Sequence, residues 1–211
     1  MRSYGLLLML VSLFAAGCAN DKVSVADALQ QSVDMGFGPA IFEVSVSEAL
    51  QQPVNGKVYT RCNIWFEDPE NISCINYQHG RVLPIGSEVT PISASQHDLV
   101  FEDTSGIRYH IEFDPETMMI PVPEYIRRVL TITPPDQLLK DVPPERLSSL
   151  KAGTVVPGMT REEVILCFGY PVPGRTPDLS GSSYLYYQGP DRTFRVVFKG
   201  NEVRRVIAPQ N

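Results

Sequence analysis

The sequence predicts an α+β protein in which short helices near the C-terminus pack on a three-stranded antiparallel meander, preceded by a small β-rich domain. Two observations predict this class. A capped helical segment and three runs of β-branched and aromatic residues follow residue 157, and several short apolar runs separated by tight turns fill residues 56–133. Prolines concentrate between the two regions, at residues 134–144, and indicate a domain boundary there.

Residues 1–17 have the features of a secretory signal peptide. Arg2 gives a positive N-terminal region, Gly5–Ala16 is a short apolar core, and small residues lead up to Cys18. The apolar core is shorter than the roughly 20 residues that a membrane-spanning helix needs. One interpretation of Cys18 is that it lies at a lipoprotein cleavage site; the alternative is an ordinary secreted protein in which this cysteine is incidental.

The small residues followed by a cysteine resemble the lipobox of bacterial lipoproteins. This resemblance implies that residues 1–17 are removed and that the Cys18 thiol carries acyl chains such as palmitate. Each buried CH₂ group contributes roughly 0.8 kcal/mol, so two or more chains hold a protein stably on a membrane. Ala19 stands where Asp would favour inner-membrane retention. We therefore expect a lipid-anchored protein that faces the periplasm from the outer membrane.

Residues 18–55 contain an internal repeat and read as a tether. Val23–Val33 and Val44–Val54 are identical at eight of eleven positions. Each copy has a serine followed three residues later by an acid, which is the spacing of a capping box. We expect two short helices, which either lie on a partner or pack under the next domain.

The β-rich region of residues 56–133 predicts a small, strongly bent sheet. Val58–Phe66 and Ile72–Gln78 flank a turn and are expected to pair as a hairpin. Leu99–Glu102 and Arg108–Phe113 form a second expected hairpin. Short strands joined by tight turns favour a partly closed, SH3-like barrel.

The cysteines of the β-rich region are candidates for a disulfide. Cys62 and Cys74 are equally far from Asp68, so they would face each other in the first hairpin. The periplasm is oxidising, and closing a loop of about a dozen residues would contribute roughly 3 kcal/mol. The alternative is two separate buried thiols. Cys167, on the apolar face of the C-terminal helix, is expected to be a core thiol.

A proline-rich linker at 134–144 leads into a C-terminal domain at residues 145–211. Thr160 and Glu163 have capping-box spacing at the start of a short helix, and Gly169 with Pro171 marks its end. Three β-rich runs follow, and Gly200-Asn201 is a hairpin turn between the last two. The expected strands are Tyr184–Tyr187, Thr193–Phe198 and Glu202–Ile207.

The C-terminal pattern resembles the SmpA/OmlA (BamE-like) domain of small outer-membrane lipoproteins. The resemblance covers roughly the last sixty residues. Phe168 stands where the family usually has Leu, and either Leu185 or Tyr184 stands where it usually has Trp. It implies helices packed on a meander and envelope protein partners, among them the β-barrel assembly machinery. The matching residues are Gly158, Met159, Thr160, Val164, Gly169 and Pro171.

No catalytic, metal-binding or cofactor-binding pattern stands above background. His79, His97 and His110 lack the spacing of a helical metal site, and no nucleophile elbow, phosphate loop or dinucleotide fingerprint is present. The net charge is −6; removing residues 1–17 removes Arg2 alone, which leaves 17 basic and 24 acidic residues and a charge of −7. We expect no enzyme activity, no cofactor, no metal and no nucleic-acid partner.

The final strands contain one candidate interaction patch. Tyr184 and Tyr186 share one strand face, and Arg192, Arg195 and Arg204 lie nearby in sequence. Tyrosine and arginine are enriched in binding hot spots, although one tyrosine face is expected to be core. The favoured hypothesis is non-catalytic protein interaction in the cell envelope. The alternative is an inhibitor or ligand-binding module, because β-lactamase inhibitor proteins resemble this fold.

Overall fold

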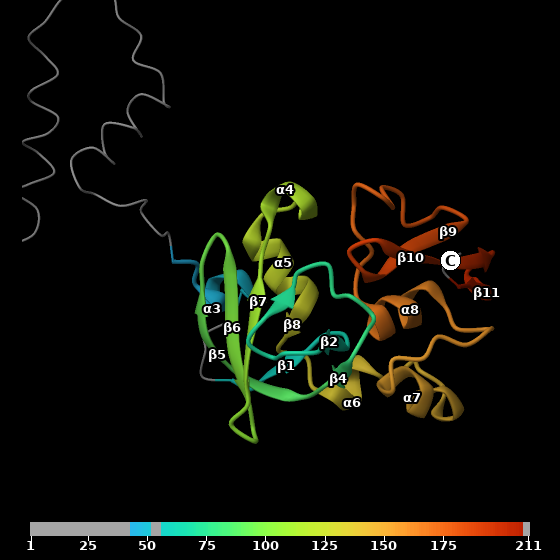
Figure 1. Ribbon diagram of the computed structural model, residues 1–211. Coiled ribbons are helices and arrows are strands. Elements are labelled where there is room, and N and C mark those ends of the chain that lie inside the picture. Colours follow the sequence, from blue (N-terminus) through green and yellow to red (C-terminus); the bar gives the residue numbers. More distant parts are fainter. Residues whose placement is uncertain (1–42, 52–55, 209–211) are drawn as a thin grey trace, which may run out of the picture. The chain divides into compact units, whose positions relative to one another are not determined.

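The computed structural model describes residues 43–51 and 56–208, which form an α+β structure as predicted (Figure 1). The predicted signal peptide, Cys18 and the first repeat copy lie outside the described residues. None of the helices in this described part has the length and apolar character that crossing a bilayer requires.

The first half of the described chain is built on a mixed, curled sheet of six strands in the order β3-β7-β6-β5-β1-β8. Strand β3 pairs with β7 in parallel, and all other neighbours are antiparallel. Strand β5 shifts register at Pro91, where a bulge bends the strand. The strands are β1 (Val58–Thr60), β3 (Ile72–Ser73), β5 (Glu88–Ala94), β6 (Asp98–Asp103), β7 (Arg108–Glu112) and β8 (Leu130–Thr131).

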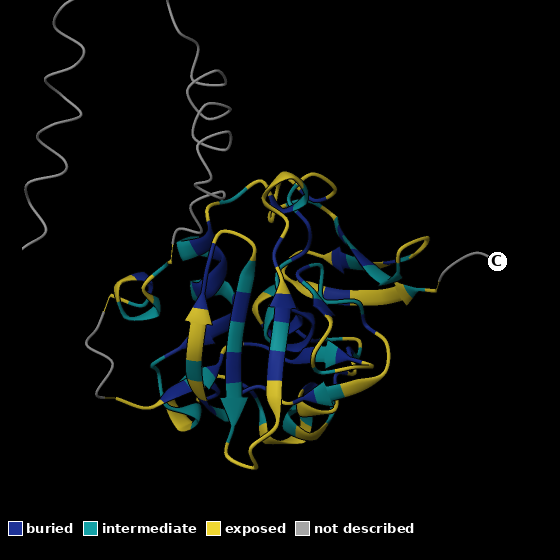
Figure 2. Ribbon diagram, turned by 60° about the vertical axis from the view of Figure 1, so that its left-hand side comes forward, coloured by how far each residue is buried: buried dark blue, intermediate teal, exposed yellow. Residues whose placement is uncertain are grey.

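Helix α5 (Val122–Val129) covers one face of this sheet, and α4 (Pro115–Met118) precedes it. Val122, Tyr125, Ile126 and Val129 are all buried, at the i, i+3, i+4 and i+7 spacing of an amphipathic helix. These side chains join Leu99, Phe101 and Ile111 in a first hydrophobic core, visible as the buried interior in Figure 2.

The second repeat copy forms one helical turn, α3 (Val46–Ala49), that packs against this first core. The Ser45 hydroxyl accepts a hydrogen bond from the Glu48 backbone N–H at 3.3 Å, as the capping-box spacing predicts. Val44 donates its backbone N–H to Ala94 in β5 at 2.8 Å. This copy therefore packs under the β-rich region, which is one of the two expected uses.

The predicted pairing of the first hairpin is wrong. Strand β2 (Ile64–Phe66) pairs with β4 (Arg81–Leu83), with Ile64 opposite Leu83. The segment expected to return beside β2 contributes β3, which joins the six-stranded sheet instead. The turn at Asp68 therefore does not set a register between the segments on either side of it.

The predicted disulfide is absent from the structure. Cys62 lies between β1 and β2 and Cys74 directly follows β3, and neither β1 nor β2 pairs with β3. The two cysteines therefore do not face each other across a strand pair, and both are free, buried thiols. Burial raises the pKa of Cys62 from its ordinary 9.0 to about 12 and also raises the pKa of Cys74.

The proline-rich segment contains its own short helix and contributes to a second core. Helix α6 (Pro135–Leu138) begins directly after Pro134, and α7 (Pro144–Lys151) begins after Pro143. Proline is favoured in the first turn because its missing N–H would have no partner there. Leu139 and Val142, between the two helices, are buried in the second hydrophobic core.

The C-terminal sheet has three antiparallel strands in the order β11-β10-β9, as predicted. They are β9 (Ser183–Gly189), β10 (Arg192–Lys199) and β11 (Glu202–Ile207). Helix α8 (Arg161–Phe168) contributes Val164, Cys167 and Phe168 to the second core, which also holds buried side chains of all three strands.

Two asparagines join the β-rich region to the C-terminal helices. The Asn63 amide donates to the carbonyls of Leu150 at 2.6 Å and Cys167 at 3.0 Å. The Asn76 amide donates to the carbonyl of Phe168 at 2.9 Å. These carbonyls belong to the last turns of α7 and α8, where a helix leaves them without internal partners. The two regions are therefore fixed to each other by buried hydrogen bonds.

Candidate interaction surface

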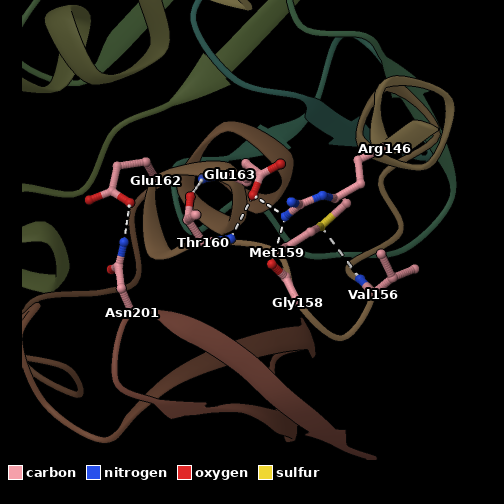
Figure 3. A network of polar contacts seen from close by, with 8 residues as sticks. All are labelled: Arg146, Val156, Gly158, Met159, Thr160, Glu162, Glu163 and Asn201. Carbon is pink, nitrogen blue, oxygen red and sulfur yellow. Dashed lines mark hydrogen bonds and ion pairs between the residues drawn. The ribbon is translucent and has the colours of Figure 1, made fainter. Parts of the chain in front are cut away.

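The turn formed by Gly158, Met159 and Thr160 is held by a network around Glu163 (Figure 3). The Thr160 hydroxyl accepts from the Glu163 N–H at 3.2 Å, and the Thr160 N–H donates to Glu163 Oε2 at 2.6 Å, so the predicted capping box is present. Arg146 of α7 donates from Nη1 to Glu163 Oε2 at 2.7 Å and to the Gly158 carbonyl at 2.6 Å. One partly buried guanidinium thus joins the turn to α7 and α8.

This turn covers the first part of the outer edge of β11. The Gly158 N–H donates to the Val203 carbonyl at 2.9 Å, and the Val203 N–H donates to the Met159 carbonyl at 2.7 Å. Gly158 has a φ of +88°, which favours glycine in the turn. The backbone groups of β11 at Val203 are therefore satisfied from outside the sheet.

The opposite edge of the sheet, along β9, is covered by the β-rich region. The Gln78 N–H donates to the Tyr187 carbonyl at 2.8 Å, and the rings of Tyr77 and Tyr187 meet edge to face with centroids 6.4 Å apart. Further along β9, the Leu185 N–H donates to the Thr176 hydroxyl at 3.1 Å. Natural sheets cover or blunt exposed edges because unpaired strand edges recruit other chains.

The last part of β11 has no such cover among the described residues. The Phe198 N–H donates to the Ser182 carbonyl, so the backbone groups of Phe198 point toward β9. Successive residues of a strand point their backbone groups to opposite neighbours, so the N–H and C=O of Val197 point toward β11. Arg205 lies opposite Val197 and directs its backbone to β10. Val206 therefore turns its N–H and C=O away from the sheet, and no described residue bonds to them.

Four exposed arginines lie on β10 and β11, the two strands nearest this free edge: Arg192, Arg195, Arg204 and Arg205. None of the ion pairs within residues 43–51 and 56–208 involves any of them. In Figure 2 the strand that leads to the C-terminus is coloured largely as exposed, in agreement with the 41% exposure of Val206. We call Val206, the four arginines and the half-buried Ile207 the β11 surface.

In the predicted interaction patch, Arg192, Arg195 and Arg204 are exposed, but the two tyrosines are buried and cannot belong to an exposed surface. Tyr184 is 1% exposed and Tyr186 is 3% exposed. Their hydroxyls donate to the carbonyls of Leu179 at 2.6 Å and Gly169 at 3.0 Å, inside the protein. Strand alternation placed both tyrosines on one face, and the helices cover that face.

Sequence reasoning missed Arg205 and the free edge. Phe198 pairs with Val203, and the next residue of β10, Val197, pairs with Arg205. Arg204 therefore has no partner on β10 and forms a β-bulge in β11. This extra residue, Arg204, changes the alternation within β11 and directs Arg205 to the outer face. The sequence did contain one signal for this surface, because Arg204 and Arg205 are adjacent in the last predicted strand.

Two of the histidines lie in isolated contacts with an acidic side chain. His110 contacts Asp98 with 2.5 Å between Nε2 and Oδ1, and His79 contacts Glu67 at 3.1 Å, each as an isolated pair. Burial raises the pKa of Cys167, so this thiol stays protonated at neutral pH. Across the described ranges, no group of three histidine, cysteine or acidic side chains could hold a metal ion.

The β11 surface combines exposed cationic side chains, an exposed valine and an uncovered strand edge. Such a surface can bind a negatively charged partner. No protein-family model, curated protein or solved structure matches the chain.

Proposed function

We propose that this protein is a lipid-anchored lipoprotein of the cell envelope that acts by non-catalytic binding to another envelope protein. The lipobox-like residues before Cys18 support the anchor and an outer-membrane, periplasm-facing location. The resemblance of the last sixty residues to the SmpA/OmlA domain supports an envelope partner, with the β-barrel assembly machinery as the leading candidate. Within this proposal, α7 and α8 on β9–β11 form the SmpA/OmlA-like domain, and residues 56–133 form an SH3-like domain.

The observation that carries the proposal is the set of four exposed arginines that form no ion pair with any described acidic residue. The whole chain has 18 basic and 24 acidic residues, so a cluster of unpaired cations is unexpected on average. Like charges held together on a free surface repel each other, and a complementary acidic surface relieves that repulsion on binding. The proposed partner therefore presents acidic side chains to β11.

The inhibitor alternative is less well supported. It requires the meander to offer its other face to a target, but Phe194, Val196 and Phe198 on that face are at most 6% exposed. They pack in the second core with α8. An inhibitor would have to use the β11 surface as well.

Site-specific crosslinking in intact cells tests the proposal. A photocrosslinking residue replaces Thr193, on the outer face of β10, or Thr90, an exposed position of the six-stranded sheet that serves as the matched control. We expect a discrete adduct with one envelope protein from position 193 and not from position 90. Combining Arg195→Glu with Arg205→Glu should abolish it, because two repulsive charges replace two attractive ones.

Membrane fractionation tests the anchor separately. The wild-type protein should sediment with outer membranes, and Cys18→Ala should remain unprocessed or be released into the periplasm. An unmodified Cys18 thiol in the mature protein, measured by intact mass, would overturn the anchor. Adducts of equal yield from positions 193 and 90 would overturn the binding role of β11.

A further inference from the structure

We infer that the acidic partner binds as an additional β-strand along β11, centred on Val206, rather than by side-chain contacts alone. The inference rests on the proposed function and specifies the form in which the partner is recognised. The geometry is that of strand addition, in which backbone hydrogen bonds provide affinity and side-chain contacts provide specificity.

Judged from the part of the chain that the structure describes, the C-terminal sheet leaves one place where a strand can be added. At the β9 edge the Tyr187 carbonyl already accepts from Gln78, and at the start of β11 both backbone groups of Val203 are used. The N–H and C=O of Val206 point outward, two residues before the last described residue, Ala208. A short extended segment that begins beside Val206 would meet no covering turn among the described residues.

The charges around this edge select the occupant. If the β11 edges of two copies paired, they would bring two sets of Arg204 and Arg205 together, which disfavours a second copy of this chain. An extended segment with acidic side chains on alternate residues places its charges opposite these arginines. Its other residues lie beside Val206, which is 41% exposed. The occupant is therefore a segment of alternating acidic and apolar residues.

A lipid surface does not fit these observations as well. Anionic headgroups can pair with arginines, but they cannot supply both a donor and an acceptor to the outward backbone groups of one residue at strand spacing. Only a polypeptide offers both at that spacing. We therefore assign the edge to protein, and vesicle binding becomes an outcome of the test.

Peptide binding to the full-length protein in detergent tests the inference. The probe is an acetylated and amidated (Glu-Val)₄ peptide with a fluorescent label. Its first control is the same peptide with N-methylated valines, which keeps the charge but loses strand hydrogen bonds, and its second control is (Lys-Val)₄. We expect (Glu-Val)₄ to bind at least about tenfold more tightly than the N-methylated form, since loss of roughly 1.4 kcal/mol is tenfold in affinity.

Variants of Val206 test the edge itself. Val206→Pro removes the outward N–H while leaving the hydrogen bonds of Arg205 and Ile207 to β10, and proline is tolerated on strand edges. Val206→Thr keeps the N–H and is the matched control. We expect Val206→Pro to weaken binding at least about tenfold and Val206→Thr to change it less than about twofold, with the far-ultraviolet circular dichroism and Trp65 fluorescence of both unchanged.

The outcomes separate the inference from the proposed function. Equal binding of the N-methylated peptide, or failure of (Glu-Val)₄ to bind while the crosslink from position 193 persists, overturns strand addition and leaves the protein-binding role standing. If Val206→Pro does not fold, the N-methylated peptide still decides. Binding to phosphatidylglycerol vesicles that Arg195→Glu abolishes, without peptide binding, overturns strand addition in favour of a lipid surface.

Discussion

Asn63 donates a hydrogen bond from Nδ2 to the carbonyl of Cys167 at 3.0 Å across 104 residues of sequence. The same amide group also donates to Leu150, and its Oδ1 accepts from the N–H of Ile85 at 2.8 Å. Asn63 is completely buried. One side chain thus bonds to the ends of two helices and to one loop, and it joins the β-rich region to α7 and α8.

We expect Asn63→Ala to lower the free energy of unfolding by about 2 kcal/mol or more, because the buried Cys167 carbonyl and Ile85 N–H each lose their partner at about 1–3 kcal/mol. The Leu150 carbonyl keeps its hydrogen bond from the Gly153 N–H. Urea unfolding followed by the fluorescence of Trp65, the single tryptophan of the chain, measures this loss. Asn71→Ala, at an exposed position, is the control and should change stability by less than about 0.5 kcal/mol. A similar small effect for Asn63→Ala would show that the clamp does not stabilise the fold.

We expect Arg146→Met to destabilise the protein by about 3 kcal/mol, because it leaves the Glu163 carboxylate buried without its cation. The Glu163 side chain is 4% exposed. Adding Glu163→Gln should recover at least half of the loss, since the neutral amide oxygen can still accept from the Thr160 N–H. Thermal unfolding of the two single variants and the double variant measures the coupling, and strictly additive effects would contradict it.

Gly153→Ala should be far more harmful than another glycine substitution at positive φ. A Cβ at Gly153 would lie 2.3 Å from Cζ2 of Trp65, and its φ is +69°. We expect a loss of about 3 kcal/mol, from backbone strain and overpacking together, with a shift in Trp65 emission. Gly106→Ala, with φ +84° and open space around it, isolates the strain and should cost about 1 kcal/mol. Equal losses would place the clash in doubt.

Stability should fall at high pH because of the buried thiols. Burial raises the pKa of Cys62 from 9.0 to about 12 in the folded protein. Between these values the unfolded chain releases a proton that the folded chain retains, so the free energy of unfolding falls as pH rises from about 9 to about 12. Urea unfolding at pH 8 and pH 10.5 should show a smaller fall for Cys62→Ala than for the wild type. An identical fall in both would assign the pH dependence to other groups.

Iodoacetamide labelling provides a second measurement on the cysteines. In the native protein at pH 8, Cys62, Cys74 and Cys167 should resist alkylation, because all three are buried and their pKa values are raised. In urea all three should react, without prior reduction. Mass spectrometry counts the adducts. Two unreactive thiols that become available only after reduction would restore the disulfide between Cys62 and Cys74.

Local signals in the sequence predicted local structure well. The capping box of Thr160 and Glu163 and the Gly200-Asn201 turn depend on residues that are close in sequence, and both are present. Alternation also grouped Tyr184 with Tyr186 correctly. It could not decide which face of the strand is buried, because that depends on where α7 and α8 pack.

Long-range pairing was not readable from the sequence. Ile72–Ser73 looked like a hairpin partner for the strand before it, yet it pairs in parallel with β7, nearly forty residues away. Parallel pairing has no turn signature of its own. The role of Asn63 was hidden for the same reason, since its partners lie in helices 87 and 104 residues further along the chain. The free edge at Val206 depends on a bulge, which shifts alternation by one residue.

The cover that Gln78 gives to β9 has an evolutionary consequence. A gene fragment encoding only residues 145–211 would produce a meander without the cover of Gln78 on β9, since Gln78 is encoded 67 codons before residue 145. Recombination could move such a fragment into another gene only if the new neighbour supplied a replacement for that cover. The β-rich region and the C-terminal region are therefore expected to occur together in related proteins.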